Sequence, residues 1–329
     1  MVIHFQSVIY ITKPNKLTFD SFPMSLHNHK YLIVICGPTA VGKTNLSLKV
    51  AKHFNAEIIS ADSRQFYREM NIGTSKPSAD QLSIVPHHFI NNLSIHQQNY
   101  NAGRYEKEAI EFLDVYFQKN DAAVMVGGSG LFIHAVCSGF DAFEKRDENE
   151  LQTIRNFLNE KDLSWLKVEV ERLDPEYYSI VDTKNPARLK RALEVIYTSG
   201  KKYSEQRIGK KVERNFIPIK IGLQMDRDQL YERINLRVDN MMEAGLLEEV
   251  RNLYPHRKLR PLQTVGYTEL LDYIEDKLTL DEAIALIKQN TRNYAKRQLT
   301  WFKKDPAILW FLPEQEKEII KYISKITSK

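Results

Sequence analysis

The sequence predicts an α/β fold, in which a doubly wound parallel sheet forms the core and an all-helical domain is inserted into it. The apolar runs at 31–36, 58–59 and 122–126 are each followed by a polar or glycine-rich turn, and helical apolar spacing separates them. Residues 145–200 then lack strand patterns, and a strand-like run returns at 215–226. Alternating strands and helices are typical of parallel sheets, and a helical stretch bracketed by strands of one sheet indicates an insertion.

The first predicted strand ends in a phosphate-binding loop. The residues that follow it match the pattern G-x-x-x-x-G-K-[ST] and open a helix-like segment: Gly37, Pro38, Thr39, Ala40, Val41, Gly42, Lys43 and Thr44. In such a loop the backbone N–H groups and the helix N-terminus face an oxyanion. Lys43 would neutralise the outer phosphate, and Thr44 would offer a hydroxyl to Mg²⁺. The core is therefore expected to be P-loop NTPase-like, although the loop does not identify its phosphate compound.

The organisation of the chain predicts a core in two segments around one insertion. The expected bounds are 30–140 and 215–329 for the core and 141–214 for the insertion. Beyond residue 228 the pattern predicts helices to the end of the chain. Residues 1–29 fit no element and lack the features of a signal peptide. These residues are either a disordered tail or the result of a translation start assigned upstream of the real start at Met24.

Composition and charge narrow the classes of protein. No apolar run reaches the 18 residues of a membrane span, and two cysteines are too few for a disulfide framework. We therefore expect a cytoplasmic protein with no membrane contact. Residues 184–214 carry ten Lys or Arg against three acids, and residues 285–304 carry six and no acid. Such clusters suit a polyanionic partner larger than one nucleotide, or they are solvated helix faces, and both interpretations stand.

Polar turns follow the second and third predicted strands. Asp62 could hold Mg²⁺, accept a proton or cap a helix, and its turn with Ser63, Arg64 and Gln65 suits the reading of a nucleobase edge. Ser129 lies in a glycine-rich turn that allows a ligand to approach closely, or that simply joins a strand to a helix. Because the carboxyl ends of parallel strands share one edge, we expect the loop 37–44, Asp62 and Ser129 to converge on one crevice.

Two pairs of residues have a spacing that bears on function. Arg233 and Arg237 are four positions apart on a predicted helix, so they share a face. Their guanidinium groups suit the oxygens of a diphosphate, and a solvated face is the alternative. His87 and His88 are adjacent in a strand and point to opposite faces, so metal binding is not expected there.

The last long predicted helix has two distinct faces. Tyr294 and Trp301 lie on an apolar face and are predicted to be core residues. The opposite face carries a stripe of Arg292, Lys296 and Lys303. This stripe could follow a phosphodiester backbone or could serve solubility alone.

From about Tyr31 to Lys303 the chain resembles the bacterial tRNA dimethylallyltransferases, also called tRNA isopentenyltransferases. The matching segments, in order, are GPTAVGKT, SADSRQFY, MNIGTSKP, VPHHFI, VGGSGLF, NPARLKRALEV, VGYTEL and TRNYAKRQLTWFKK. The resemblance implies that the loop holds the diphosphate of dimethylallyl diphosphate. It also implies transfer of the prenyl group to N6 of adenosine 37 in tRNAs that read codons beginning with U. The base would leave its stack to reach the crevice.

The resemblance also implies roles for individual residues. Asp62 would orient the adenine amine and take its proton, Ser129 would lie near the reacting centre, and Lys43 and Arg237 would act on the diphosphate together with Mg²⁺ and Arg233. The insertion would grip the anticodon stem-loop, and the enzyme would act as a monomer. Contacts to tRNA are implied for Asp62, Ser63, Arg64, Gln65, Ala187, Arg188, Leu189, Lys190, Arg191, Gln263, Thr264, Val265, Gly266, Tyr267, Thr268, Arg292 and Lys296.

The chain departs from the family pattern at three positions. Ser129 replaces a usual threonine, Ala187 replaces a glutamine, and Thr268 replaces a basic residue. These changes keep the chemistry but bear on tRNA affinity, so a relative that binds tRNA without catalysis stays open. Three other classes of protein fit the sequence less well. A small-molecule kinase needs no basic insertion, an ATPase needs strand-terminal acids where VGGSG stands, and an enzyme that prenylates free adenine nucleotides needs no extended cationic surface.

Overall fold

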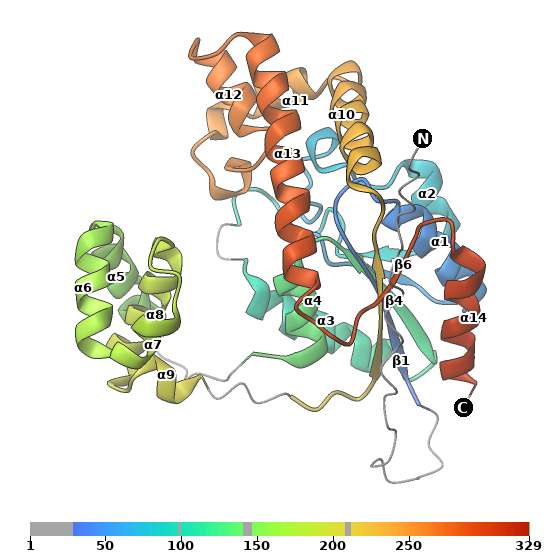
Figure 1. The fold of residues 1–329 in the computed structure, drawn as a ribbon, viewed down its shortest axis with the longest axis horizontal. Coiled ribbons are helices and arrows are strands. Elements are labelled where there is room, and N and C mark those ends of the chain that lie inside the picture. Colours follow the sequence, from blue (N-terminus) through green and yellow to red (C-terminus); the bar gives the residue numbers. More distant parts are fainter. Residues whose placement is uncertain (1–28, 98–99, 141–146, 208–211, 329) are drawn as a thin grey trace, which may run out of the picture.

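The computed structural model describes residues 29–328, apart from 98–99, 141–146 and 208–211. The predicted N-terminal extension therefore lies outside the described residues, except for His29. A sheet with the strand order β3-β2-β4-β1-β5-β6 forms the centre of the fold, and all its named strand pairs are parallel (Figure 1). The strands are β1 (Tyr31–Cys36), β2 (Ile58–Ser60), β3 (His87–His88), β4 (Ala122–Gly127), β5 (Ile217–Leu223) and β6 (Leu309–Phe311). The predicted α/β fold with a parallel sheet is confirmed.

The sheet is covered on both faces, which explains its apolar central strand. All six residues of β1 are buried, as expected for a parallel strand between two helical layers. Leu32 and Val34 face a core shared with α3 and α4, whereas Ile33 and Ile35 face a core shared with α1 and α14. The helices of the core are α1 (Lys43–His53), α2 (Ala79–Ile84), α3 (Ala102–Tyr116), α4 (Gly130–Ser138), α10 (Arg227–Glu243), α11 (Leu246–Leu253), α12 (Thr268–Ile274), α13 (Leu280–Phe302) and α14 (Glu316–Thr327), with short 3₁₀ turns η1 (Ile72–Thr74), η2 (Tyr254–His256) and η3 (Arg260–Leu262).

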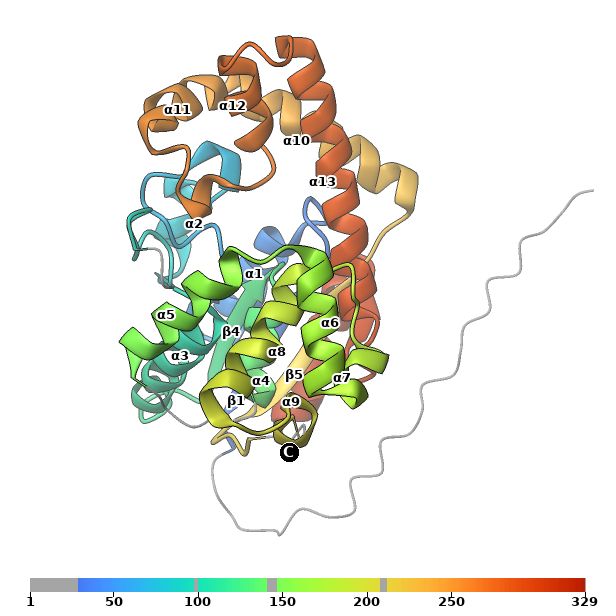
Figure 2. The same ribbon diagram turned by 90° about the vertical axis from the view of Figure 1, so that its left-hand side faces the viewer.

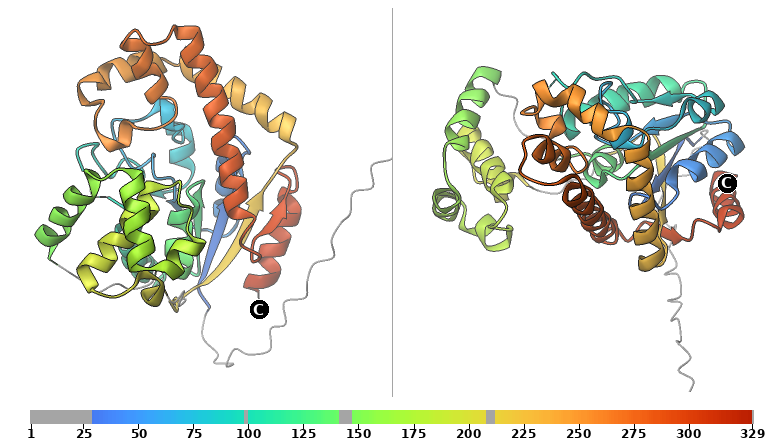
Figure 3. Two further views of the ribbon diagram at one scale, coloured as in Figure 1. Left: turned by 60° about the vertical axis from the view of Figure 1, so that its left-hand side comes forward. Right: turned by 90° about the horizontal axis from the view of Figure 1, so that it is seen from above.

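A separate helical bundle occupies the stretch predicted to be an insertion. It contains α5 (Glu148–Asn159), α6 (Leu163–Leu173), α7 (Pro175–Ile180), α8 (Pro186–Ser199) and α9 (Tyr203–Gln206), and it lies between α4 and β5 in the chain. The bundle has its own buried cluster around Val170 and Leu193, and α8 packs against both α5 and α6 (Figure 2). Seen from above, the bundle and α14 lie at opposite ends of the molecule (Figure 3).

The prediction of helices only beyond residue 228 is wrong, because β6 adds a strand near the C-terminus. Leu309 pairs with Ile221, and Phe311 pairs with Leu223, both in parallel register. The strand has only three residues and follows a break at Asp305 and Pro306. So short an apolar run cannot be distinguished from a helical segment by its periodicity.

Among the residues that the structure describes, every helix is too short or too polar to span a membrane.

Candidate active site

A crevice of about 260 Å³ lies beyond the carboxyl ends of β1, β2 and β4. Helices α10 and α13, which lie at the top of the molecule in Figure 1, complete its walls. The expected convergence occurs for the loop and Asp62, which line the crevice together with Gly127 at the end of β4. Ser129 is not one of the lining residues, although its Oγ accepts a hydrogen bond from the Ser63 N–H beside Asp62 (3.1 Å). The polar and charged residues that line the crevice include Thr39, Lys43, Thr44, Ser60, Asp62, Gln65, Ser75, Arg233, Arg237, Tyr294 and Gln298.

The loop after β1 has the backbone that the motif predicts. Gly37 and Gly42 adopt positive φ angles of 142° and 107°, and a side chain at Gly37 would lie 2.6 Å from the carbonyl oxygen of Leu223. Gly42 is the N-cap of α1, so the positive end of this helix faces the crevice. Val41 points away from the crevice into the core and is fully buried. Together these features form a site suited to an anion.

Cationic side chains gather around this loop. Lys43 Nζ donates hydrogen bonds to the carbonyl oxygens of Gly37 (3.1 Å) and Pro38 (2.7 Å). Arg237 Nη1 donates to Thr39 Oγ1 (3.4 Å), so the guanidinium group lies next to the loop. Arg233 also lines the crevice, as its spacing from Arg237 predicts. Among the residues that the structure describes, Asp62 is the only carboxylate that lines the crevice beside these positive charges, so the crevice favours a multiply charged anion.

The pKa of Lys43 is lowered to about 8, mainly by burial and in smaller part by the nearby Arg237, while Asp62 opposes the shift. Only the charged ammonium attracts phosphate oxygens. Affinity for inorganic diphosphate should therefore be full below about pH 8 and should decline as the pH rises through 8. Titration calorimetry from about pH 7 to about pH 9.5 would measure this affinity. Lys43→Ala should bind diphosphate weakly at every pH and should show no decline near pH 8. A diphosphate affinity that stays constant across this pH range in the native protein would contradict a role for Lys43 in binding diphosphate.

The carboxylate of Asp62 is held by its own turn. Its Oδ1 accepts a hydrogen bond from the backbone N–H of Arg64 (3.0 Å). The neighbouring Ser63 N–H donates to Ser129 Oγ (3.1 Å), which in turn donates to Ser63 Oγ (3.3 Å). The Asp62 turn and the glycine-rich turn after β4 are therefore joined directly. Gly127 allows this contact, because an added Cβ would lie 2.3 Å from the carbonyl oxygen of Ala61.

Two residues of α13 belong to the site although the sequence did not mark them as functional. Gln298 accepts a hydrogen bond from the Thr39 N–H (2.9 Å) and donates one to the Gly128 carbonyl (2.9 Å), so it joins the phosphate loop to the glycine-rich turn. Tyr294 lines the crevice, and burial raises the pKa of its hydroxyl to about 12, so the hydroxyl stays protonated at neutral pH. Their spacing of four positions on one helix face was the available signal.

The prediction that Tyr294 and Trp301 are core residues is wrong. Tyr294 lines the crevice, and Trp301 is 43% exposed. The reason is that α13 crosses the edge of the crevice, so only part of its apolar face meets the core. The indole of Trp301 covers Gly130, where an added Cβ would lie 2.1 Å from Cδ1.

Lys296 and Lys303 on the predicted basic stripe are exposed, whereas Arg292 donates a hydrogen bond to Asn235 Oδ1 (2.7 Å).

The residues with implied tRNA contacts fall into three groups. In the bundle, Ala187, Arg188 and Arg191 are exposed on α8. Near the crevice, the side-chain amide of Gln65 donates to the carbonyl oxygens of Thr74 and Ser75, and Arg64 Nη1 donates to the Pro261 carbonyl (3.2 Å). Lys190 also lies on α8 and belongs to the bundle group. The third group lies on the C-terminal helices, before and at the start of α12 (Gln263, Thr264, Val265, Gly266 and Thr268) and on α13 (Lys296).

Two of the implied tRNA contacts are corrected by the structure. Leu189 is fully buried in the core of the bundle, and Tyr267 is fully buried beneath η1. Neither side chain can reach RNA. Leu189 lies on the inner face of an amphipathic helix whose outer face carries the basic residues.

The adjacent histidines have separate partners. His88 Nε2 lies 2.6 Å from Glu57 Oε2, and His87 Nδ1 donates to the Val85 carbonyl (2.7 Å). Within the described ranges, no group of three or more His, Cys, Asp or Glu side chains has the arrangement of a metal site. A metal in the crevice would therefore depend on oxygens of its ligand as well as on protein oxygens.

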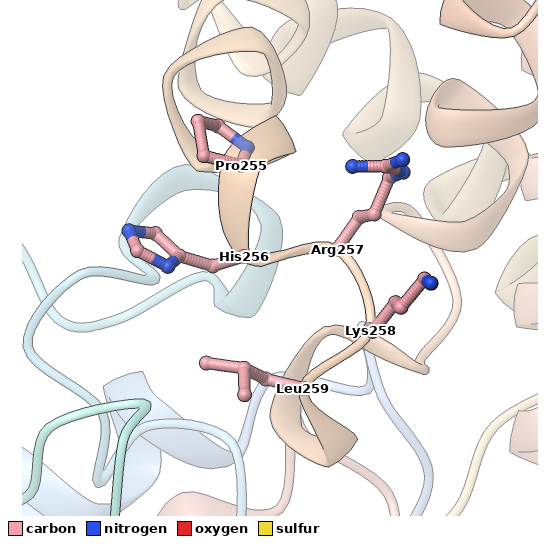
Figure 4. Close-up of a pocket in the computed structure, with 5 residues that line it drawn as sticks. All are labelled: Pro255, His256, Arg257, Lys258 and Leu259. Atoms are coloured by element: carbon pink, nitrogen blue, oxygen red, sulfur yellow. The ribbon is translucent and has the colours of Figure 1, made fainter.

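A second hollow, of about 310 Å³, lies away from the crevice and shares none of its lining residues (Figure 4). One short stretch forms it: Pro255, His256, Arg257, Lys258 and Leu259. It lacks the convergence of polar groups from several elements that characterises ligand sites. The crevice is therefore the candidate active site.

The fold and the crevice define a P-loop protein with a carboxylate and an arginine pair beside its anion site. The model of the family described as IPP transferase matches residues 65–305. A tRNA dimethylallyltransferase from Christiangramia forsetii is 52% identical over 300 residues, which covers 91% of this chain and 99% of that protein. The chain belongs to the IPP transferase family.

Solved structures are similar over most of the chain. The full-length tRNA isopentenylpyrophosphate transferase from Bacillus halodurans matches with a TM-score of 0.68 and 35% identity, covering 91% of this chain and 97% of that one. A eukaryotic dimethylallyltransferase acting on tRNA matches with a TM-score of 0.72 and 28% identity, covering 83% of this chain and 69% of that one.

Proposed function

We propose that the protein is a tRNA dimethylallyltransferase. It transfers the dimethylallyl group of dimethylallyl diphosphate to N6 of adenosine 37 in tRNAs that read codons beginning with U, and it releases diphosphate. The observation that carries this proposal is the junction of a phosphate loop with the Asp62 and Ser129 turns in one crevice. A prenyl diphosphate, as the donor of the prenyl group, and a nucleophile can meet there. A relative that is 52% identical to this chain is named tRNA dimethylallyltransferase.

The cationic side of the crevice acts on the leaving group. The bond between the allylic carbon and the diphosphate oxygen breaks, so negative charge accumulates on the diphosphate. Loop amides, Lys43, Arg233 and Arg237 are positioned to balance that charge. Groups that are already oriented toward the developing charge stabilise the transition state more than the ground state.

The carboxylate side acts on the nucleophile. As the new bond forms between N6 of adenine and the allylic carbon, N6 loses a proton. Asp62 accepts it, while its contact with the Arg64 N–H keeps the carboxylate in place. The hydroxyl of Ser129, fixed by Ser63, lies beside the same turn and contributes a hydrogen-bonding group near the reacting atoms.

The crevice also fits Mg²⁺, the proposed cofactor. This ion takes oxygen ligands and is usually held by one or two protein groups together with substrate phosphates. The Thr44 hydroxyl would hold the Mg²⁺ ion. The Asp62 carboxylate lines the same crevice. When bound, Mg²⁺ would neutralise charge on the diphosphate.

The bundle supplies the proposed grip on the anticodon stem-loop. Arg188 is exposed on α8, so it can contact a phosphate. Arg188→Ala should weaken tRNA binding at low salt and should make the log–log salt slope shallower by about one unit. Filter binding at several salt concentrations would measure both.

The matched control for this prediction is Arg172→Ala on α6 of the same bundle. Arg172 is exposed but already forms two hydrogen bonds with Glu169, of 2.9 Å and 2.6 Å. The Arg172→Ala variant should leave the salt slope of tRNA binding unchanged. Equal slopes for Arg188→Ala and the native protein would exclude Arg188 from the RNA grip.

The proposed function is tested by offering two acceptors. Purified protein, Mg²⁺ and radiolabelled dimethylallyl diphosphate are mixed with unmodified tRNA, or with AMP, and label is counted in each acceptor. Label in tRNA alone is the expected result. Label in AMP would identify an enzyme that prenylates mononucleotides, and no label in either would refute prenyl transfer.

A further inference from the structure

The segment 71–75, which contains η1, lies between helix α11 and the crevice, and one carboxylate holds it from the α11 side. Glu249 Oε2 accepts the backbone N–H groups of Asn71 (3.0 Å) and Ile72 (2.8 Å), and Oε1 accepts that of Gly73 (3.1 Å). Three successive N–H groups that point at one anion form a specific and rigid attachment. Glu249 is 178 positions from Asn71 in the chain, so this attachment joins two distant parts of the fold.

Tyr267 fixes the carboxylate in turn. Its hydroxyl donates to Glu249 Oε1 (2.6 Å), and its ring covers Gly73 so closely that an added Cβ there would lie 2.5 Å from the ring. Burial raises the pKa of Tyr267 far above its usual range, so the hydroxyl remains a donor. The two side chains and the segment therefore form one unit.

The other end of the segment enters the active site. Ser75 lines the crevice, and its Oγ accepts a hydrogen bond from Arg237 Nε (2.7 Å). The Ser75 carbonyl accepts another from Gln65 Nε2 (3.1 Å). Ser75 thus contacts both a diphosphate-side arginine and the turn that carries Asp62.

Ser75 adopts a left-handed conformation, with φ 47° and ψ 51°. Residues with a Cβ rarely occupy this region, and they remain there only where the surroundings determine the backbone. The contacts of Glu249 with Asn71, Ile72 and Gly73, two to four positions before Ser75, provide such a determinant. If these contacts were lost, we would expect Ser75 to relax to an ordinary conformation and its Oγ to move away from Arg237.

We infer that Glu249, which lies outside the crevice, is a positioning residue for the diphosphate site, acting through segment 71–75 and Ser75 on Arg237. This inference rests on the proposed function for the identity of the diphosphate compound, although the binding of inorganic diphosphate can be measured without it. Glu249 touches no reacting atom, so its effect should appear in the affinity for diphosphate and not in that for tRNA.

The primary test compares Glu249→Gln with Glu248→Gln. Glutamine keeps the size of the side chain but replaces one acceptor oxygen with an amino group that faces N–H donors. Glu248 is an exposed neighbour on α11 that lies 3.6 Å from Arg251, so its variant makes the same change in charge. Calorimetry with inorganic diphosphate, steady-state kinetics with dimethylallyl diphosphate and tRNA binding are measured for both.

Glu249→Gln should weaken diphosphate binding and raise the KM for dimethylallyl diphosphate about tenfold, roughly the effect of one charge-assisted hydrogen bond. Its tRNA affinity should stay within about twofold of the native value. Glu248→Gln should match the native protein. A Glu249→Gln variant that is folded at the assay temperature, with only a lower Tm and native diphosphate binding, would show a merely structural role and overturn the inference.

A second pair of variants tests the route through Ser75. Once Ser75→Ala has removed the acceptor for Arg237, adding Glu249→Gln should change diphosphate affinity by less than about twofold. Full additivity of the two effects would refute transmission through Ser75. If Glu249→Gln does not fold, Tyr267→Phe replaces it, because it removes one hydrogen bond to the carboxylate. It should weaken diphosphate binding about threefold, and unchanged binding would overturn the inference.

Discussion

Asp62→Asn should lower kcat for prenyl transfer by about 10²- to 10⁴-fold, the usual contribution of a general base. Asparagine keeps an oxygen that can accept the Arg64 N–H, so the turn should hold its shape while the proton acceptor is lost. Rapid-quench measurement of label transfer to tRNA would give the rate of the chemical step. The contact between Ser63 and Ser129 should persist, because it does not involve Asp62.

The affinity for tRNA is the control for Asp62→Asn, and it should remain close to the native value. A variant that transfers the prenyl group at the native rate would show that another group takes the proton. A collapse of tRNA binding would instead make Asp62 a recognition residue.

Arg237→Ala should lower kcat/KM for dimethylallyl diphosphate by about 10²- to 10³-fold, since it removes a half-buried charge from the proposed diphosphate site. Its guanidinium group is held by Ser75 and Thr39, so it is oriented before the substrate binds. Arg237→Lys keeps the charge but loses this double contact and should give an intermediate loss. Steady-state kinetics at saturating tRNA would measure both variants.

Arg227→Ala is the matched control, because Arg227 is an exposed residue of the same helix and lies 3.5 Å from Asp228. It should leave kcat/KM unchanged. Native kinetics for Arg237→Ala, or equal losses for the two variants, would remove Arg237 from the diphosphate site.

The parts of the fold that follow local rules were predictable from the sequence. The phosphate loop could be predicted because its glycines, lysine and threonine occur in consecutive positions between a strand and a helix. The crevice could be predicted because parallel strands deliver their carboxyl ends to one edge. The residues of β1 alternate between two cores because successive side chains of a strand point to opposite faces of the sheet.

Features that depend on contacts between distant segments were not predictable in this way. Glu249 lies on an amphipathic helix beside Glu248, and nothing in the sequence distinguishes the residue that binds η1 from its exposed neighbour. The direction that Tyr294 and Trp301 face depends on where α13 crosses the edge of the crevice. Strand β6 exists because the edge of β5 offers a partner, and its three residues carry too little pattern to reveal it.

We expect this crevice to transfer the prenyl group of a prenyl diphosphate to a single adenosine of tRNA and to release diphosphate. The most direct measurement is nucleoside mass spectrometry of tRNA after reaction with the native protein, Mg²⁺ and dimethylallyl diphosphate. We expect N6-(dimethylallyl)adenosine to approach one per tRNA, and to be absent when adenosine 37 is replaced by guanosine. Prenylated adenosine in the guanosine-37 tRNA, or none in either tRNA, would contradict the account.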